Sequence, residues 1–320
     1  MRLRRLRLPQ TIAAVTALAV MTALLLHPDR YLRAVSDGVL LWATCVLPSL
    51  LPFMLLTRIV AGLGTPPGVS KRLSPAAHAL FGVSGIGGGI FLLGVVSGYP
   101  VGAKLVADAV ASGGVSREEG KRLALFCSCG APLFIVGSMG TALLHAPAVG
   151  WTVYAGHALA AVLCGVLFSK LPGLRRKNKC TAAAKPVLAP PKIDLFALTQ
   201  STVLSVLGVG LWVSVFYMAS DMLMDVGLFS GGTMLSAALM GLVEVTRGTA
   251  MLAPFVAASP RAVAAVAAGL VSFSGVCIHI QTLAFLLPAG VKPLPYLAAK
   301  AAHAVLAAAV TYPLALLFLR

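Results

Sequence analysis

Seven long apolar runs dominate this sequence and decide the solvent in which the chain can fold. The runs cover residues 11–26, 38–62, 121–144, 149–169, 194–219, 262–287 and 294–319. Each is close to the ~20 residues that an α-helix needs to cross a ~30 Å hydrocarbon core, although the first is short. The chain is 59% hydrophobic and only 11% charged, too little polar surface for a soluble domain. We therefore expect an all-α polytopic membrane protein with seven spanning helices.

Two further apolar stretches, 79–114 and 229–258, are interrupted in the middle. The first is broken by "SGYPVG" at 97–102 and the second by "EVTRG" at 244–248. Neither half of either stretch is comfortably long enough to span a bilayer. We therefore predict two re-entrant helical hairpins, because such a backbone break is tolerated where it is buried in protein or lines a cavity.

The distribution of basic residues predicts the orientation. With a cytoplasmic amino terminus, the inside loops hold seventeen of the 25 Lys and Arg residues, and the outside loops and carboxyl terminus hold four. The first apolar run has a basic start but no small-x-small cleavage site, so we expect an uncleaved first helix. Positive-inside topology explains the net charge of +16 better than nucleic-acid binding, since no folded module or aromatic interleaving surrounds the basic segments.

The order of elements predicts a repeat. Residues 38–169 and 194–320 each give helix, hairpin, helix, helix, preceded by an N-terminal helix and connection (1–37) and joined by a basic cytoplasmic linker (170–193). Each half crosses three times, so the second is inserted upside down relative to the first. Inverted repeats with broken helices are typical of secondary transporters, with the solute site at the repeat interface.

Charged residues near the hairpin tips are the first candidate site residues. Lys104 follows the first tip, and Glu244 and Arg247 lie at the second. One reading is structural, with Lys104 paired to Asp108 and Glu244 paired to Arg247 along one helix face. The other is that Lys104 and Arg247 face a polar cavity from opposite sides and attract an anion.

Two spanning runs also carry breaking residues in mid-membrane. "CSCGAPLF" contains Ser128, Gly130 and Pro132, and "SFSGVCIHIQ" contains Ser274 and Gly275. Pro132 lacks an amide donor and disfavours helix at the residue before it. An unwound turn would leave amides and a positive half-helix end for a carboxylate, and close packing of small residues is the alternative.

His279 follows the second break, where it either lines a cavity or forms a packed hydrogen bond.

Cys127 and Cys129 have no further ligands at metal spacing, which favours buried thiols over a metal site. The sequence contains no Walker motif, GxSxG or HExxH, so we expect neither an enzyme nor a cofactor.

The sequence also resembles a family. "LLGVVSGYPVGAKLVAD", "SREEGKRLALFCSCGAPLFIVGSMG", "GLVEVTRG" and "SFSGVCIHIQ" look like the sporulation integral membrane proteins of the YlbJ type. These belong to a nucleoside-recognition (Gate) superfamily and are similar to concentrative nucleoside transporters. The resemblance implies a carrier of dipicolinic acid in the outer forespore membrane, and a homo-oligomer is compatible with it. It carries over to Ser97, Gly98, Tyr99, Pro100, Gly102, Lys104, Glu244, Thr246, Arg247 and Gly248.

We therefore expect a multi-pass carrier for a small anion, dipicolinate above all, working by alternating access. The alternatives are a nucleoside or nucleobase transporter and a non-transporting scaffold of a sporulation membrane complex. A scaffold would have a hairpin interface without water, in which Lys104 pairs with Asp108 and Glu244 pairs with Arg247. The predicted substrate-binding residues are Ser97, Gly98, Tyr99, Lys104, Ser128, Gly130, Glu244, Thr246, Arg247, Ser274, Gly275 and His279.

Overall fold

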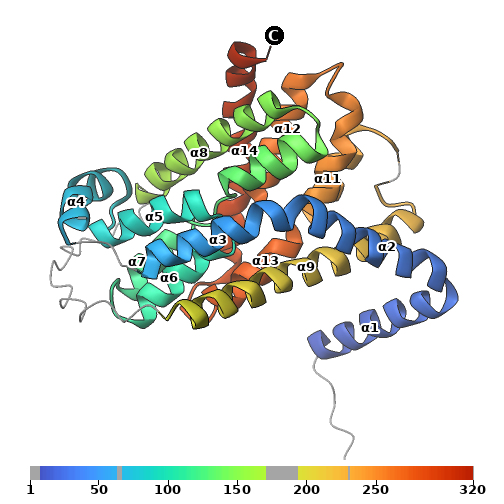
Figure 1. The fold of residues 1–320 in the computed structure, drawn as a ribbon, viewed down its shortest axis with the longest axis horizontal. Coiled ribbons are helices and arrows are strands. Elements are labelled where there is room, and N and C mark those ends of the chain that lie inside the picture. The colour runs from blue at the N-terminus through green and yellow to red at the C-terminus, as the bar shows by residue number, and fades with distance from the viewer. Residues whose placement is uncertain (1–7, 63–66, 171–193, 230, 320) are drawn as a thin grey trace, which may run out of the picture.

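The computed structural model describes residues 8–62, 67–170, 194–229 and 231–319, and in these ranges the chain is helical without any strand (Figure 1). This confirms the all-α prediction. The predicted basic linker, 170–193, lies almost entirely outside the described residues. The first part of the chain forms α1 (Leu8–Leu26), α2 (Pro28–Leu41), α3 (Leu47–Gly62), α4 (Pro67–Phe81), α5 (Gly85–Ser97), α6 (Val101–Ala111), α7 (Arg117–Ala124) and α8 (Pro147–Ser169). The second forms α9 (Leu195–Asp225), α10 (Met234–Val243), α11 (Val245–Leu252), α12 (Pro260–Phe273), α13 (Gly275–Leu286) and α14 (Pro293–Phe318).

Five helical segments of the described chain are long and apolar enough to cross a membrane. They are Pro28–Val60, Pro147–Ser169, Leu195–Asp225, Pro260–Leu286 and Pro293–Phe318. A sixth span arises if Gly68–Phe81 and Gly85–Ser97, bent by 81° at their junction, are taken together. The polytopic prediction thus stands, whereas the count of seven spans is not reached, because α1 is short and the run 121–144 is broken.

Two segments predicted as connections are helical. Residues 28–41 form α2, which continues through a π-helical turn, η1 (Trp42–Val46), into α3. Between the predicted runs 38–62 and 79–114, most of the connecting residues belong to α4. Both helices begin with a proline, Pro28 and Pro67, which is favoured in a first turn because its missing amide is unpaired there anyway. The charged residues of these two helices lie on exposed helix surfaces.

Both predicted interruptions occur where expected, and the helix pairs that they join, α5–α6 and α10–α11, are called the first and second hairpins. Their re-entrant insertion in a membrane stays a prediction. Helices α5 and α6 meet at Gly98–Pro100, where Gly98 has φ 78°, and α10 and α11 meet at the extended residue Glu244. In each pair the two helices touch through glycines. A Cβ added to Gly102 would lie 3.2 Å from the Gly94 Cα, and one added to Gly248 would lie 2.3 Å from the Gly241 Cα.

Both predicted helix breaks are also present. After α7 the chain has no helical structure from Cys127 to Ala131, and it resumes at Pro132 and continues as the π-helix η2 (Phe134–Leu143). Helices α12 and α13 are separated at Ser274, whose φ of 86° is left-handed. Pro132 and the Ser274–Gly275 pair thus act as the sequence predicted.

The same order of elements occurs twice, α3, α5–α6, α7–η2, α8 and then α9, α10–α11, α12–α13, α14. Helices α8 and α14 pack on each other and on α12 (Figure 1). His157 and His303 each lie ten positions after the proline that begins their helix, and their rings stack with centroids 4.9 Å apart. The inverted insertion of the second half remains a prediction, because it depends on the membrane.

Candidate functional site

The two hairpin tips, the end of the first helix break and the helix after the second break line one cavity. Its walls come from both halves of the chain: Val46, Leu50, Tyr99, Pro100, Ala131, Phe134, Val209, Val213, Glu244, Val245, Thr246, Cys277, Ile278 and Gln281. Its volume of about 30 Å³ has room for about two water molecules, since one needs ~10–15 Å³. In this structure the cavity is therefore too small to hold a solute such as a carboxylate.

The first tip reaches the cavity through Tyr99. Gly98 supplies the left-handed backbone that turns the chain, and it lies so close to the next break that an added Cβ would be 2.6 Å from the Ala131 nitrogen. The Tyr99 ring packs edge-on against Phe134 with centroids 6.1 Å apart. Its hydroxyl is buried and has no hydrogen-bond partner among the described residues. Ser97 is buried too, but its hydroxyl donates to the Leu93 carbonyl of its own helix.

The second tip reaches the cavity through Glu244 and Thr246. Glu244 is 1% exposed, and its carboxylate accepts a hydrogen bond from the Arg247 amide at 2.7 Å and another from the Thr246 hydroxyl. It thereby caps the N-terminus of α11, where a negative charge is favoured by the free amides and the helix dipole. Glu244 is the one charged residue that lines the cavity within the described chain.

Arg247 points away from this cavity, toward α9. Its guanidinium pairs with Asp221, donates to the Tyr217 carbonyl at 2.9 Å and lies 4.3 Å from the centre of the Tyr217 ring. The predicted side-chain pair of Glu244 with Arg247 is therefore wrong, because Asp221 is the carboxylate that Arg247 meets. The arginine fixes the second hairpin to α9.

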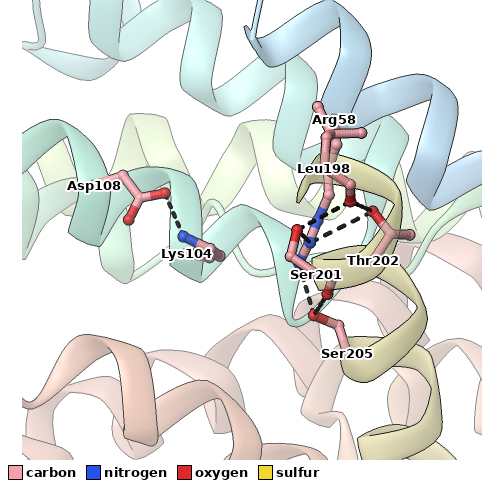
Figure 2. A network of polar contacts seen from close by, with 7 residues as sticks. All are labelled: Arg58, Lys104, Asp108, Leu198, Ser201, Thr202 and Ser205. Carbon is pink, nitrogen blue, oxygen red and sulfur yellow. Dashed lines mark hydrogen bonds and ion pairs between the residues drawn. The ribbon is translucent and has the colours of Figure 1, made fainter. Parts of the chain in front are cut away.

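Lys104 lies outside the cavity as well. Its Nζ is 2.6 Å from Asp108, four residues along α6, and both side chains are substantially exposed (Figure 2). The structural reading of this pair is thus confirmed, whereas the expectation that Lys104 and Arg247 face one cavity is wrong in this structure. Beside the pair, Arg58 of α3 donates to the hydroxyls of Ser201, Thr202 and Ser205 on α9 (Figure 2).

The first break is held by a histidine that the sequence analysis did not single out. His157 of α8 accepts a hydrogen bond at Nε2 from the Gly130 amide, 2.9 Å away. Its Nδ1 lies 2.7 Å from the Ser272 hydroxyl at the end of α12. Because Nε2 accepts, the neutral ring carries its proton on Nδ1 and donates to Ser272. His157 thus joins the first break to the end of the helix that precedes the second break.

The same break is also contacted by a buried lysine. Lys300 of α14 is 1% exposed, and its Nζ donates to the Ser128 carbonyl at 2.8 Å. His303, one turn further along α14, donates from Nε2 to the His157 carbonyl at 3.2 Å. Ser128 and Gly130 therefore present their backbone to the α8–α14 pair, and Lys300 and the two histidines form a polar centre behind the cavity.

At the second break, Gly275 packs against the second hairpin near its tip. A Cβ at Gly275 would lie 3.2 Å from the Gly241 carbonyl and 3.4 Å from the Val245 amide. Ser274 is fully buried, and His279 is 4% exposed with Nδ1 3.4 Å from the Tyr296 hydroxyl. His279 is thus a packed hydrogen-bonding residue, and it does not line the cavity.

Of the predicted site residues, the structure brings Tyr99, Glu244 and Thr246 to the cavity walls. Gly98, Gly130 and Gly275 shape the tip and the breaks behind them, and Lys104 and Arg247 form ion pairs elsewhere. The described chain has no group of three or more His, Cys, Asp or Glu residues that could hold a metal ion.

Comparison with known proteins supports the resemblance noted in the sequence. The chain is 34% identical over 140 residues to "Sporulation integral membrane protein YlbJ" of Bacillus subtilis (strain 168). The match covers 44% of this chain and 34% of the relative, so the aligned region is about a third of that protein's length. No protein-family model matches the chain, and no solved structure matches it. Over the aligned residues, the chain is thus similar to a YlbJ-type sporulation integral membrane protein.

Proposed function

We propose that this chain is a carrier in a sporulation membrane that exposes a central site alternately to its two sides. The observation that carries the proposal is the convergence of two hairpin tips and two broken helices on one cavity. Irregular backbone at membrane depth is costly unless it is buried in protein or lines a cavity, and transporters use such breaks to bind solutes. The name of the relative adds the sporulation setting.

The proposed solute is a small carboxylate, dipicolinate in the first place, as the resemblance implies. Helices α11 and α13 begin beside the cavity, and the N-terminus of a helix favours a carboxylate. The Glu244 carboxylate occupies the α11 amides in this structure. An entering anion must therefore displace Glu244 or meet a tip that has moved. Lys104 and Arg247 can contribute charge only in a state in which their pairs with Asp108 and Asp221 have opened.

The test is uptake of dipicolinate into proteoliposomes, detected by the fluorescence of trapped terbium. We expect protein-dependent uptake that an excess of uridine does not reduce. Thr246→Val should abolish most of it, whereas Thr249→Val should retain it, because both threonines are buried on α11 but only Thr246 lines the cavity. Uptake that uridine competes with would indicate the nucleoside carrier, and equal uptake by both variants would contradict the assignment of the site.

A scaffold without transport is the second candidate, and two observations favour it. Lys104 and Arg247 form ion pairs with Asp108 and Asp221. The cavity has room for about two water molecules at most. A carrier caught between its two open states would look the same. Absence of uptake by folded protein in both orientations, together with stable capture of a membrane partner, would support the scaffold.

A further inference from the structure

Lys300 is a buried lysine that donates to a backbone carbonyl and not to a carboxylate. Within the described residues its ammonium has no carboxylate within 4 Å, and it donates to the Ser128 carbonyl instead. The ion pairs of the described chain involve other cations, namely Arg30, Lys104, Lys121 and Arg247. A buried ammonium without a carboxylate is costly, and an ionisable residue inside a membrane segment often marks a functional position.

The surroundings of Lys300 offer no compensating negative charge. The titratable groups near enough to interact with its charge are Cys129 in the first break, Cys164 and His157 on α8, His279 on α13 and His303 on α14. Helix α12, which packs along α14, adds Arg261 near the C-terminal end of α14, where it donates to the Leu319 carbonyl. None of these groups is a carboxylate, so the Ser128 carbonyl is the main acceptor for the ammonium.

The segment that Lys300 holds also supports the first hairpin. The Cys127 carbonyl, one residue before Ser128, faces Gly94 and Gly102, where added Cβ atoms would lie 2.4 and 2.2 Å from it. Ala131, at the other end of the break, packs on Gly98 at the tip. Residues 127–131 are therefore the surface on which the first hairpin rests, and movement of this segment must move the tip that carries Tyr99.

Among the described residues, the second helix break has no equivalent of this contact. Lys300 lies seven positions after Pro293, which begins α14, and Tyr154 lies seven positions after Pro147, which begins α8. Tyr154 is only half-buried and uncharged at neutral pH. A buried cation thus holds the first break and not the second.

We propose that Lys300 is a positioning residue that makes the first helix break sensitive to protons. With its proton, the ammonium holds the Ser128 carbonyl and keeps the 127–131 segment closed under the first hairpin tip. When the proton leaves, the hydrogen bond loses its charge assistance and weakens, so the segment and tip move more easily. If the proposed carrier function holds, proton movement at Lys300 would couple to opening of the first half.

The test follows the native cysteines of the full-length protein in proteoliposomes. Labelling by N-ethylmaleimide would be quantified for each cysteine by mass spectrometry from pH 6 to pH 9, relative to the unfolded protein at the same pH. Cys129 in the first break is fully buried, and Cys164, which is buried in α8, serves as the internal reference. We expect relative labelling of Cys129 to rise several-fold toward pH 9, while that of Cys164 stays flat.

Three variants separate the charge of Lys300 from its size. Lys300→Arg cannot lose its proton and should keep Cys129 protected at all pH values, whereas Lys300→Met should leave it labelled even at pH 6. Lys71→Met, which removes an exposed lysine of α4, should behave like the wild type. A flat wild-type profile, a rise equal to that of Cys164, or the same rise in Lys300→Arg would overturn the proposal. Because this measurement needs no solute, failure of the proposed role of Lys300 can be distinguished from failure of the proposed carrier function.

Discussion

The two hairpin tips meet at the same cavity but are stabilised in different ways. The first turns through Gly98 and Pro100, carries no charge, and is held by close fit against the backbone at Ala131. The second turns through a buried carboxylate, Glu244, and is tied to α9 by Arg247. Contact between backbones allows little adjustment, whereas hydrogen bonds and ion pairs can be exchanged for others. We infer that the second tip can respond directly to an anion, while the first moves only with the break beneath it.

The largest effect is expected from a methyl group at the first tip. Gly98→Ala places a Cβ 2.6 Å from the Ala131 nitrogen at a residue with φ 78°, and should lower the free energy of unfolding by about 3 kcal/mol or more. Gly113→Ala is the matched control, because Gly113 has φ 73° but nothing within 4 Å, and it should cost only about 1 kcal/mol. Melting temperatures in detergent check this, and equal losses would remove steric fit as the explanation.

The next effect tests the buried cap of the second tip. Glu244→Ala removes the acceptor of the Arg247 amide and the Thr246 hydroxyl in the interior, and should destabilise by about 2–3 kcal/mol. Thr233→Ala removes the cap of α10, where the hydrogen bonds are part-buried, and should cost about 1 kcal/mol. Chemical denaturation of the two variants in the same detergent gives the comparison. A Glu244 variant as stable as the Thr233 variant would show that burial adds nothing to this cap.

A smaller effect separates the two ion pairs beside the tips. Asp221→Asn leaves the largely buried Arg247 without its carboxylate and should cost about 1–3 kcal/mol. Asp108→Asn breaks an exposed pair and should cost less than about 0.5 kcal/mol. Raising the salt concentration should weaken only the exposed pair. The distinction fails if the two substitutions shift the melting temperature equally.

The smallest change in stability is expected at Tyr99. Tyr99→Phe removes a buried hydroxyl that has no partner among the described residues, so stability should change by less than about 0.5 kcal/mol. If the hydroxyl binds the solute, half-maximal uptake of dipicolinate should require a several-fold higher concentration. Unchanged uptake would limit the role of the first tip to its shape.

Local breaks were predictable from the sequence because the residues that cause them act locally. Glycine and proline marked the first tip, and Pro132 and the Ser274–Gly275 pair marked the two helix breaks. The helices at 28–41 and 67–81 were missed, since their charged surface residues resemble loop composition. Helix boundaries in polar segments depend on packing that the sequence does not display.

The partners of charged residues were not predictable, because they come from distant parts of the chain. Arg247 pairs with Asp221, 26 residues away, and Lys300 contacts Ser128, 172 residues away. Lys300 could have been found by one signal, a lone lysine inside the apolar run 294–319, since such residues inside a membrane often mark function. The role of His157 follows only from the meeting of α8 with both breaks.

The most direct measurement of the central claim is protection of Cys277 by dipicolinate. Cys277 lines the cavity, whereas Cys164 is buried in α8 away from it. Saturating dipicolinate should slow labelling of Cys277 by N-ethylmaleimide in the reconstituted protein and leave Cys164 unchanged. Binding of dipicolinate, shown by equilibrium dialysis, without protection of Cys277 would place the solute elsewhere and contradict the assignment of the cavity as its site.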